Sequence, residues 1–214
     1  MTIAYRALAR EHADAAPMGQ FLMRRLSYYR SVECPADRRD ELEGSVKAKV
    51  DRWHIGSYDD SSKKTRKSLR AMGVHVEPGV TMRDVTFSNV NSTQIGLDSF
   101  VLCFSAAPSA VLASGGRNIL LRISDIEALG KLLTEAHQAD VGPFECGLVA
   151  YGQRSFDPRE AFLEPNPFIK EARFSDENEI RLVAHAIDDR ATLLTNCPRA
   201  RSLIERVDWP RPTS

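Results

Sequence analysis

Short apolar runs separated by polar or turn-forming residues recur along this chain, and they constrain its fold more than any other feature. The run 100–104 ends at Ser105, and the run 180–184 follows directly on Glu179. Apolar runs of this length, bounded by turn residues, are typical of buried strands. Because helical periodicity appears in few places, we predict many short strands and only a few helices, which indicates an α+β or a mainly β fold, and we take α+β as the fold class.

The length of 214 residues suits one domain with a core of its own. We expect a single domain over residues 1–214, and we find no internal repeat. The alanine-rich segment Ala4–Ala16, broken by Pro17, predicts an N-terminal helical extension within residues 1–20. Residues 208–214 are expected to form a flexible tail.

Charge and cysteine content exclude several classes of protein. Lysine plus arginine and aspartate plus glutamate both number 29, so no bulk charge attracts the chain to nucleic acid or to a membrane. The cysteines show no Cys-x-x-Cys pair, which favours reduced thiols in a cytoplasmic protein and no metal site. No segment approaches the roughly 18 apolar residues of a membrane span, so we expect neither a signal peptide nor an anchor.

Local patterns predict the elements between these landmarks. We expect a strand over 21–30 that ends at Arg30 and a half-exposed strand around Val46–Val50. Two strands joined by a turn are expected between 74 and 90, followed by a polar connection over 89–96. A helix should begin with a capping box at Ser124 and run to His137, and a further strand is expected over 147–151.

The segment 57–70 holds five basic side chains among hydroxyl groups. One interpretation is a solvated loop or hairpin tip. The other is a surface that meets an anionic substrate, including a nucleic-acid backbone.

Polar side chains stand where predicted strands begin or end. Arg30 and Ser105 each follow an apolar run, while Glu177 and Glu179 precede one. The two glutamates are either an ordinary solvated strand end or a catalytic Glu-x-Glu aimed into a cleft by a rigid strand.

Arg30, Ser105 and Glu179, in that order, resemble the Arg–Ser–Glu class of ADP-ribosyltransferases. The aromatic-arginine motif is matched by Tyr28-Tyr29-Arg30 and the Glu-x-Glu motif by residues 177–179, whereas the Ser-Thr-Ser motif is degenerate around Ser105. The resemblance implies a split β-sandwich of two mainly antiparallel sheets and the use of NAD as substrate.

A second resemblance spans residues 20–185. Phe-x-Lys at 168–170 and Phe-x-x-Glu-x-Glu-x-Arg at 174–181, together with Asp40-x-x-Glu43-Gly44, look like a large bacterial family of uncharacterised domains linked to phage defence and toxin-like roles. It implies a toxin or defence effector with an antitoxin or another defence component as partner.

The transferase resemblance also implies roles. Cleavage of the nicotinamide–ribose bond builds positive charge on the ribose, which Glu179 would stabilise. Arg30 would grip the phosphates of NAD, with Tyr29, Ser31 and Lys170 as further cofactor contacts. Ser105 and Glu177 would orient the ribose and the acceptor nucleophile, where the acceptor is a protein or a nucleic acid.

Other interpretations remain open. Arg30 could pair with Glu33 or Glu43, and Arg181 could neutralise Glu179. The alternative function is a non-catalytic sensor or nucleic-acid-binding module that uses Lys63–Arg70. A nuclease would need a metal site, which the spacing of the carboxylates does not indicate.

Overall fold

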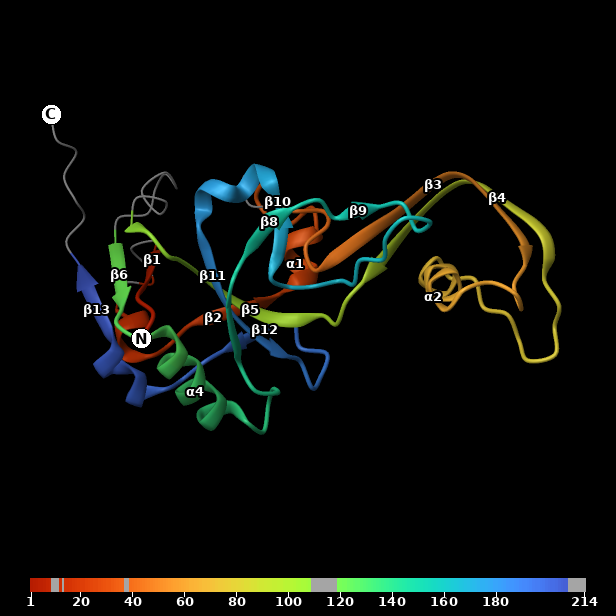
Figure 1. Cartoon of the computed structure of the whole chain (residues 1–214). Helices are drawn as coiled ribbons and strands as arrows, with labels where there is room; N and C mark the ends of the chain where they lie inside the picture. Colours follow the sequence, from red (N-terminus) through yellow and green to blue (C-terminus); the bar gives the residue numbers. More distant parts are fainter. Residues whose placement is uncertain (9–11, 13, 37–38, 109–118, 208–214) are drawn as a thin grey trace, which may run out of the picture.

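An antiparallel sheet of eight strands dominates the described part of the chain (Figure 1). The computed structural model describes residues 1–214 except 9–11, 13, 37–38, 109–118 and 208–214, so the predicted tail lies outside the described residues. The strands of this sheet are β1 (Ala4–Leu8), β2 (Leu22–Arg25), β5 (Ser99–Ser105), β6 (Ile119–Ile123), β7 (Glu145–Leu148), β11 (Glu179–His185), β12 (Thr192–Leu194) and β13 (Ile204–Val207).

The remaining elements are short apart from one hairpin. A three-stranded sheet contains β3 (Ser45–Ser57), β4 (Arg83–Ile95) and β9 (Ser155–Phe156), and a parallel pair joins β8 (Ala150–Gly152) to β10 (Ile169–Glu171). The helices are α1 (Leu26–Arg30), α2 (Lys63–Ala71) and α4 (Ile126–His137), with 3-10 helices η2 (Ala16–Met18), η3 (Ala172–Glu177) and η4 (Pro198–Leu203). The prediction of an α+β fold, mostly antiparallel with few helices, is confirmed.

Strands β5 and β11 lie at the centre of the main sheet. They pair antiparallel over seven positions, from Glu179 opposite Ser105 to His185 opposite Ser99. Strand β7 lies on the other edge of β11, while β2 and β1 share the other edge of β5. The two apolar runs of the sequence therefore form adjacent buried strands, as predicted.

The side chains of β11 alternate between the apolar core on one face of the strand and charged residues on the other. Ile180, Leu182 and Ala184 belong to the main apolar cluster, which also contains Leu129 and Leu133 of α4. Each fully buried leucine contributes roughly 1.5–3 kcal/mol to folding. Glu179 and Arg181 lie on the opposite face of the strand, because successive side chains of a strand point to opposite sides.

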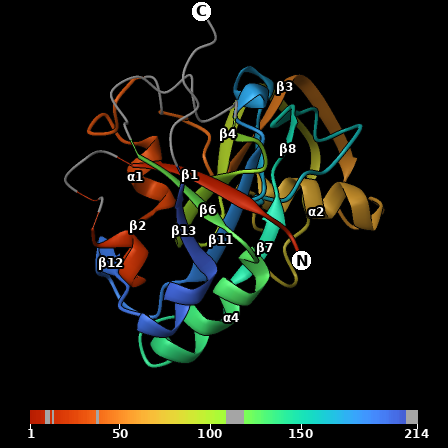
Figure 2. The ribbon, with the colours of Figure 1, turned by 90° about the vertical axis from the view of Figure 1, so that its left-hand side faces the viewer.

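The hairpin of β3 and β4 extends away from the main sheet, and α2 lies beside its outer end (Figures 1 and 2). Val46, Ala48 and Val50 are buried while Lys49 is exposed, which confirms the predicted alternation. Helix α2 begins after Ser62, whose hydroxyl accepts a hydrogen bond from the Thr65 amide at 3.1 Å. The segment 57–70 is thus at a hairpin tip, as one interpretation had it, but it is largely helical rather than a loop.

Two predictions for the N-terminal region are wrong. The segment expected to begin a helix forms strand β1, because Ala4, Ala7 and Leu8 are buried where β1 pairs with β6. Tertiary pairing here outweighs the helix propensity of alanine. The strand expected over 21–30 stops at Arg25, and Leu26–Arg30 forms α1, whose first turn is held by hydrogen bonds from Ser27 to Asp98. Arg30 therefore ends a helix rather than a strand.

Smaller differences follow from local hydrogen bonding. The polar connection expected over 89–96 belongs to β4 down to Ile95, and of the two strands expected between 74 and 90 only the second forms. Asp125 caps α4 by accepting from the amides of Glu127 and Ala128. Ser124 does not cap the helix, because its amide and hydroxyl donate to the carbonyl of Leu203.

Candidate functional site

Two glutamates, a lysine and an arginine meet where η3 joins β11. Glu177 ends η3 and Glu179 begins β11, with Asn178 between them at a φ of 43°. Asparagine accepts this left-handed conformation more readily than most residues. The turn places both carboxylates next to Lys170, so the two members of the Glu-x-Glu motif share one cation.

Arg181 lies between two buried carboxylates. Its Nη1 and Nη2 donate to Glu43 at 2.7 and 3.0 Å, while its Nε donates to Glu179 Oε1 at 2.7 Å. A further hydrogen bond goes to the carbonyl of Pro167. Arg181, Glu43 and Glu179 are each no more than 3 % exposed. The expectation that Arg181 neutralises Glu179 is therefore confirmed, although the pair is buried rather than at the surface.

Lys170 connects the inner carboxylate to the outer one. Its Nζ lies 2.6 Å from Glu177 Oε2 and 3.1 Å from Glu179 Oε2, and it also lies over the ring of Phe174. Glu177 remains half-buried, with 38 % of its side chain exposed. Glu43, Arg181, Glu179, Lys170 and Glu177 thus form one chain of ion pairs, which we call the charge cluster.

The two glutamates of the motif have pKa values shifted in opposite directions. Burial alone would raise the pKa of Glu179, but the charges of Arg181 and Lys170 outweigh it and lower the pKa to about 2. Burial, together with the smaller effect of Glu179, raises the pKa of Glu177 although Lys170 lowers it. For Lys170, the two carboxylates overcome burial and raise its pKa. Glu179 is thus a fixed anion, and Glu177 is the carboxylate better able to accept a proton.

Ser105 lies beside the charge cluster without contacting either carboxylate. It is the register partner of Glu179, and its hydroxyl lies 2.8 Å from the carbonyl of Ala107 and 2.9 Å from the carbonyl of Glu177. A hydroxyl can donate to only one of these carbonyls at a time. Ser105 therefore anchors the backbone on which Glu177 is mounted.

Tyr151 and Cys103 also border Glu179, and neither was selected from the sequence. The Tyr151 hydroxyl accepts a hydrogen bond from the Glu179 amide at 2.8 Å. Burial, and then the charge of Glu179, raises the pKa of the Cys103 thiol. Cys103 stands two residues before Ser105 on the same face of β5, a spacing that could have identified it.

Arg30 contacts the backbone of Glu43 and does not face Glu179. Its guanidinium donates to the carbonyl of Glu43 at 2.5 Å and lies 3.8 Å from Asp98. The carboxylate of Glu43 turns instead to Arg181. The arginine that faces Glu179 is therefore Arg181, and Arg30 reaches the charge cluster only through Glu43.

The neighbours of Arg30 occupy different positions. Burial, and then the nearby Cys103, raises the pKa of the Tyr29 hydroxyl, with a smaller contribution from Glu179, so Tyr29 lies near the charge cluster. The Ser31 hydroxyl donates to the carbonyl of Tyr28 at the end of α1. Ser31 is thus part of a helix end.

Asp40 and Glu43 of the Asp-x-x-Glu-Gly motif both pair with buried arginines. Arg154 Nη2 lies 2.6 Å from Asp40 Oδ2, and both side chains are almost completely buried. Asp40 also accepts from the amide of Leu42, which fixes the turn that leads to Glu43. The Glu43–Arg181 pair therefore holds this loop against the charge cluster, and the Asp40–Arg154 pair holds it against the segment that leads into β9.

Within the described ranges, no group of three or more histidine, cysteine, aspartate or glutamate side chains could hold a metal ion. No helix in those same ranges is long and apolar enough to cross a membrane.

Comparison with known proteins does not assign the site. No protein-family model matches the chain, and no similar protein was found among curated proteins or solved structures.

Proposed function

We propose that this chain is an NAD-dependent enzyme of the ADP-ribosyltransferase type, which transfers ADP-ribose to a macromolecule or hydrolyses NAD at the charge cluster. The observation that carries the proposal is the bridge of Lys170 between Glu177 and Glu179, directly beside Ser105. It unites the Glu-x-Glu motif and the strand-end serine of the resemblance in one place.

The charge balance of the cluster suits this reaction. Three carboxylates and two cations leave one excess negative charge among the five side chains, and the most exposed carboxylate is Glu177. Departure of nicotinamide builds positive charge on the ribose, as in glycoside cleavage, so an anion beside the ribose lowers the barrier. Glu177 is the member of the cluster that a bound ribose can reach.

The burial of Glu179 changes the role expected for it. Its oxygens are held by Arg181 and Lys170, and only 3 % of the residue is exposed. In this proposal Glu179 positions Lys170, and Glu177 acts on the substrate. Because burial raises its pKa, Glu177 can also take the proton of the attacking water or acceptor group.

The detailed fold, the biological role, the acceptor and the partner that the resemblances imply are proposals. A split sandwich would place the dinucleotide between the main sheet and the smaller sheets. A toxin or phage-defence role, a protein or nucleic-acid acceptor and an antitoxin partner stay predictions.

Titration calorimetry with NAD, combined with chromatographic detection of nicotinamide release, tests the proposal. We expect NAD binding, and a loss of about 10²–10³ in turnover for Glu177→Gln. Asp176→Asn is the matched control, because it removes one carboxylate from an exposed position of the same 3-10 helix. Absence of binding at about 1 mM NAD, near the upper end of ordinary substrate KM values, would exclude this function, as would equal turnover of the two variants.

A further inference from the structure

The hairpin of β3 and β4 together with α2, residues 45–95, forms a basic arm on a neutral chain. These residues include nine lysines and arginines but only five aspartates and glutamates, whereas the whole chain has a formal net charge of zero. The rest of the molecule therefore carries the opposite excess. Such charge asymmetry favours contact between the arm and a polyanion.

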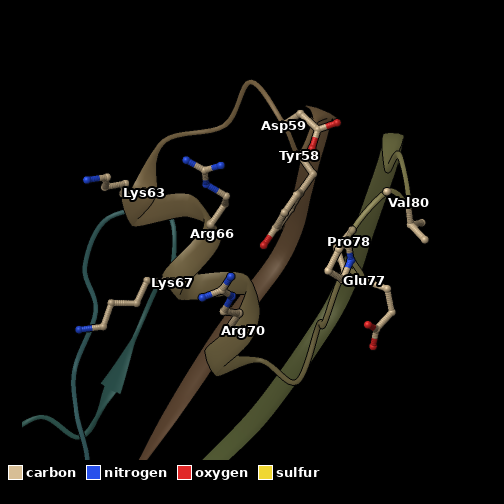
Figure 3. Close-up of a pocket in the computed structure, with 11 residues that line it drawn as sticks. Tyr58, Asp59, Lys63, Arg66, Lys67, Arg70, Glu77, Pro78 and Val80 are labelled. Carbon is tan, nitrogen blue, oxygen red and sulfur yellow. The ribbon is translucent and has the colours of Figure 1, made fainter.

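A cavity of about 590 Å³ lies between α2 and the hairpin (Figure 3). Four basic residues of α2 line it, namely Lys63, Arg66, Lys67 and Arg70. In Figure 3 the side chains of Lys63 and Lys67 point away from the hairpin, while those of Arg66 and Arg70, four residues apart, lie closer to it. Residues at this spacing are neighbours on a helix surface. The helix therefore contributes two guanidinium groups to the lining of the cavity.

Arg66 and Arg70 differ from the neighbouring Lys67, whose side chain is held by other residues. Lys67 forms an ion pair with Glu164 at 2.7 Å and lies over the ring of Phe162. Among the described residues, the side chains of Arg66 and Arg70 form neither an ion pair nor a hydrogen bond. Their donors are available to a ligand.

Tyr58 adds a hydroxyl group to the lining of the cavity. Only 7 % of this residue is exposed, and its hydroxyl has no hydrogen-bond partner in the part of the chain that the structure describes. Figure 3 shows the ring between α2 and the hairpin, with its hydroxyl directed toward Arg70. The hydroxyl oxygen itself is not fully buried, so it is open to the cavity and can donate a hydrogen bond to a group that enters it.

The acidic residues of the cavity do not oppose an anion there. Asp59 and Glu77 line its rim, and Figure 3 shows both carboxylates turned away from Arg66 and Arg70. The cavity therefore offers the guanidinium groups of two arginines and one hydroxyl group, and this set of hydrogen-bond donors suits phosphate oxygens.

We propose that this cavity binds a backbone phosphate of a nucleic acid, with Arg66 and Arg70 on its oxygens and Tyr58 donating a hydrogen bond. The exposed cations Lys49 and Arg52 of β3 add to the positive charge of the arm outside the cavity. A chain of phosphates can follow such a surface, whereas a single phosphate would use the cavity alone. This site does not depend on NAD cleavage at the charge cluster.

Fluorescence anisotropy of the full chain with a labelled single strand of about 20 nucleotides, longer than the roughly 4–16 nucleotides that one binding module covers, tests the proposal. We expect Arg66→Ala combined with Arg70→Ala to weaken binding at least about tenfold, and to reduce the slope of log K against log salt by about 1.4. Tyr58→Phe keeps the charge and should weaken binding by a smaller factor. The control variant combines Lys131→Ala and Arg201→Ala, which removes two exposed cations from the other end of the molecule.

The outcomes separate a specific site from general attraction. A loss confined to the arm variants supports the proposal. Equal losses in the arm and control variants would overturn it, as would the absence of oligonucleotide binding. Inorganic phosphate is the second probe: if the wild type binds it as tightly as the oligonucleotide, the cavity takes small phosphates and the nucleic-acid proposal fails. Circular dichroism confirms that each variant is folded.

Discussion

Arg181 and Glu43, separated by 138 residues in sequence, form a buried ion pair closed by two hydrogen bonds of 2.7 and 3.0 Å. Each side chain is only 2 % exposed. The pair joins the loop before β3 to the central strand β11, so the base of the hairpin is fixed to the main sheet at the charge cluster. A buried ion of this kind requires its partner, because an unpaired charge in the interior is costly.

Replacement of Glu43 by alanine should destabilise the protein. We expect the free energy of unfolding to fall by about 3–5 kcal/mol, because Arg181 would remain buried with one carboxylate fewer. Urea denaturation followed by circular dichroism measures this change. Glu41→Ala, at an exposed position of the same loop, should change the free energy by less than about 0.5 kcal/mol. Equal midpoints for the two variants would show that the pair does not hold the loop.

The two glutamates of the Glu-x-Glu motif should respond differently to replacement by glutamine. The pKa of Glu177 is raised, so its ionised form weakens the folded state at pH values above its unfolded pKa. Glu177→Gln should therefore be at least as stable as the wild type near neutral pH. Glu179→Gln leaves Arg181 and Lys170 with one anion fewer and should be clearly less stable.

Thermal unfolding of both glutamine variants near neutral pH, beside the NAD turnover assay, separates structure from chemistry. A Glu177→Gln protein that is folded but inactive fits the proposed division of roles. The reverse order of stabilities would contradict the position of Glu179 as the fixed anion of the cluster.

Stability should fall in acid because of Glu179. Its pKa is about 2 in the folded protein against 4.5 for an unperturbed glutamate, so the unfolded state binds more protons between these values. The stabilisation is present above about pH 4.5 and is lost as the pH falls toward 2, by an amount on the order of 3 kcal/mol. Urea denaturation from about pH 6 down to about pH 3 follows most of this window.

The exposed ion pair of Lys67 with Glu164 provides the control for the acid measurement. Both side chains are more than half exposed, so Glu164→Gln should leave the acid dependence nearly unchanged. A flat profile in the wild type would contradict the lowered pKa of Glu179.

Gly19 should be intolerant of any side chain. Its φ is 81°, and a Cβ atom there would lie 2.0 Å from the carbonyl oxygen of Cys197. Gly79 has a similar φ of 84° but open space around it, so Gly79→Ala should cost only about 1–2 kcal/mol, the strain of the left-handed conformation. Gly19→Ala should cost more, because backbone must move. Comparison of the two melting temperatures isolates the clash, and equal losses would argue against it.

Local sequence was sufficient for much of the secondary structure. The apolar runs 100–104 and 180–184 are strands, the periodic segment that ends at His137 is a helix, and Val46, Ala48 and Val50 alternate along a strand. These patterns reflect short-range sterics and the burial of one face, which neighbouring residues determine among themselves. The helix α2 was missed, although Ser62 before Lys63 carried a recognisable cap.

The candidate site could be located from sequence only in part. Glu177, Glu179 and Lys170 lie within ten residues of one another, and the structure brings all three together. Arg30 was expected to end a strand and to contact the phosphates of NAD, but it ends the helix Leu26–Arg30 and its guanidinium donates to the backbone of Glu43. Whether a short apolar-aromatic segment continues as a strand or turns into a helix depends on distant groups such as Asp98.

The sequence by itself determined which segments alternate, which are apolar and where carboxylates stand at the ends of buried strands. Only the tertiary structure decided which of those carboxylates is buried and which is open to a substrate. Glu177 and Glu179 are two residues apart and chemically identical, yet one is half-buried and the other almost completely enclosed. The difference arises because Arg181 and Glu43, brought together by the packing of the loop against β11, enclose Glu179 and leave Glu177 at the edge.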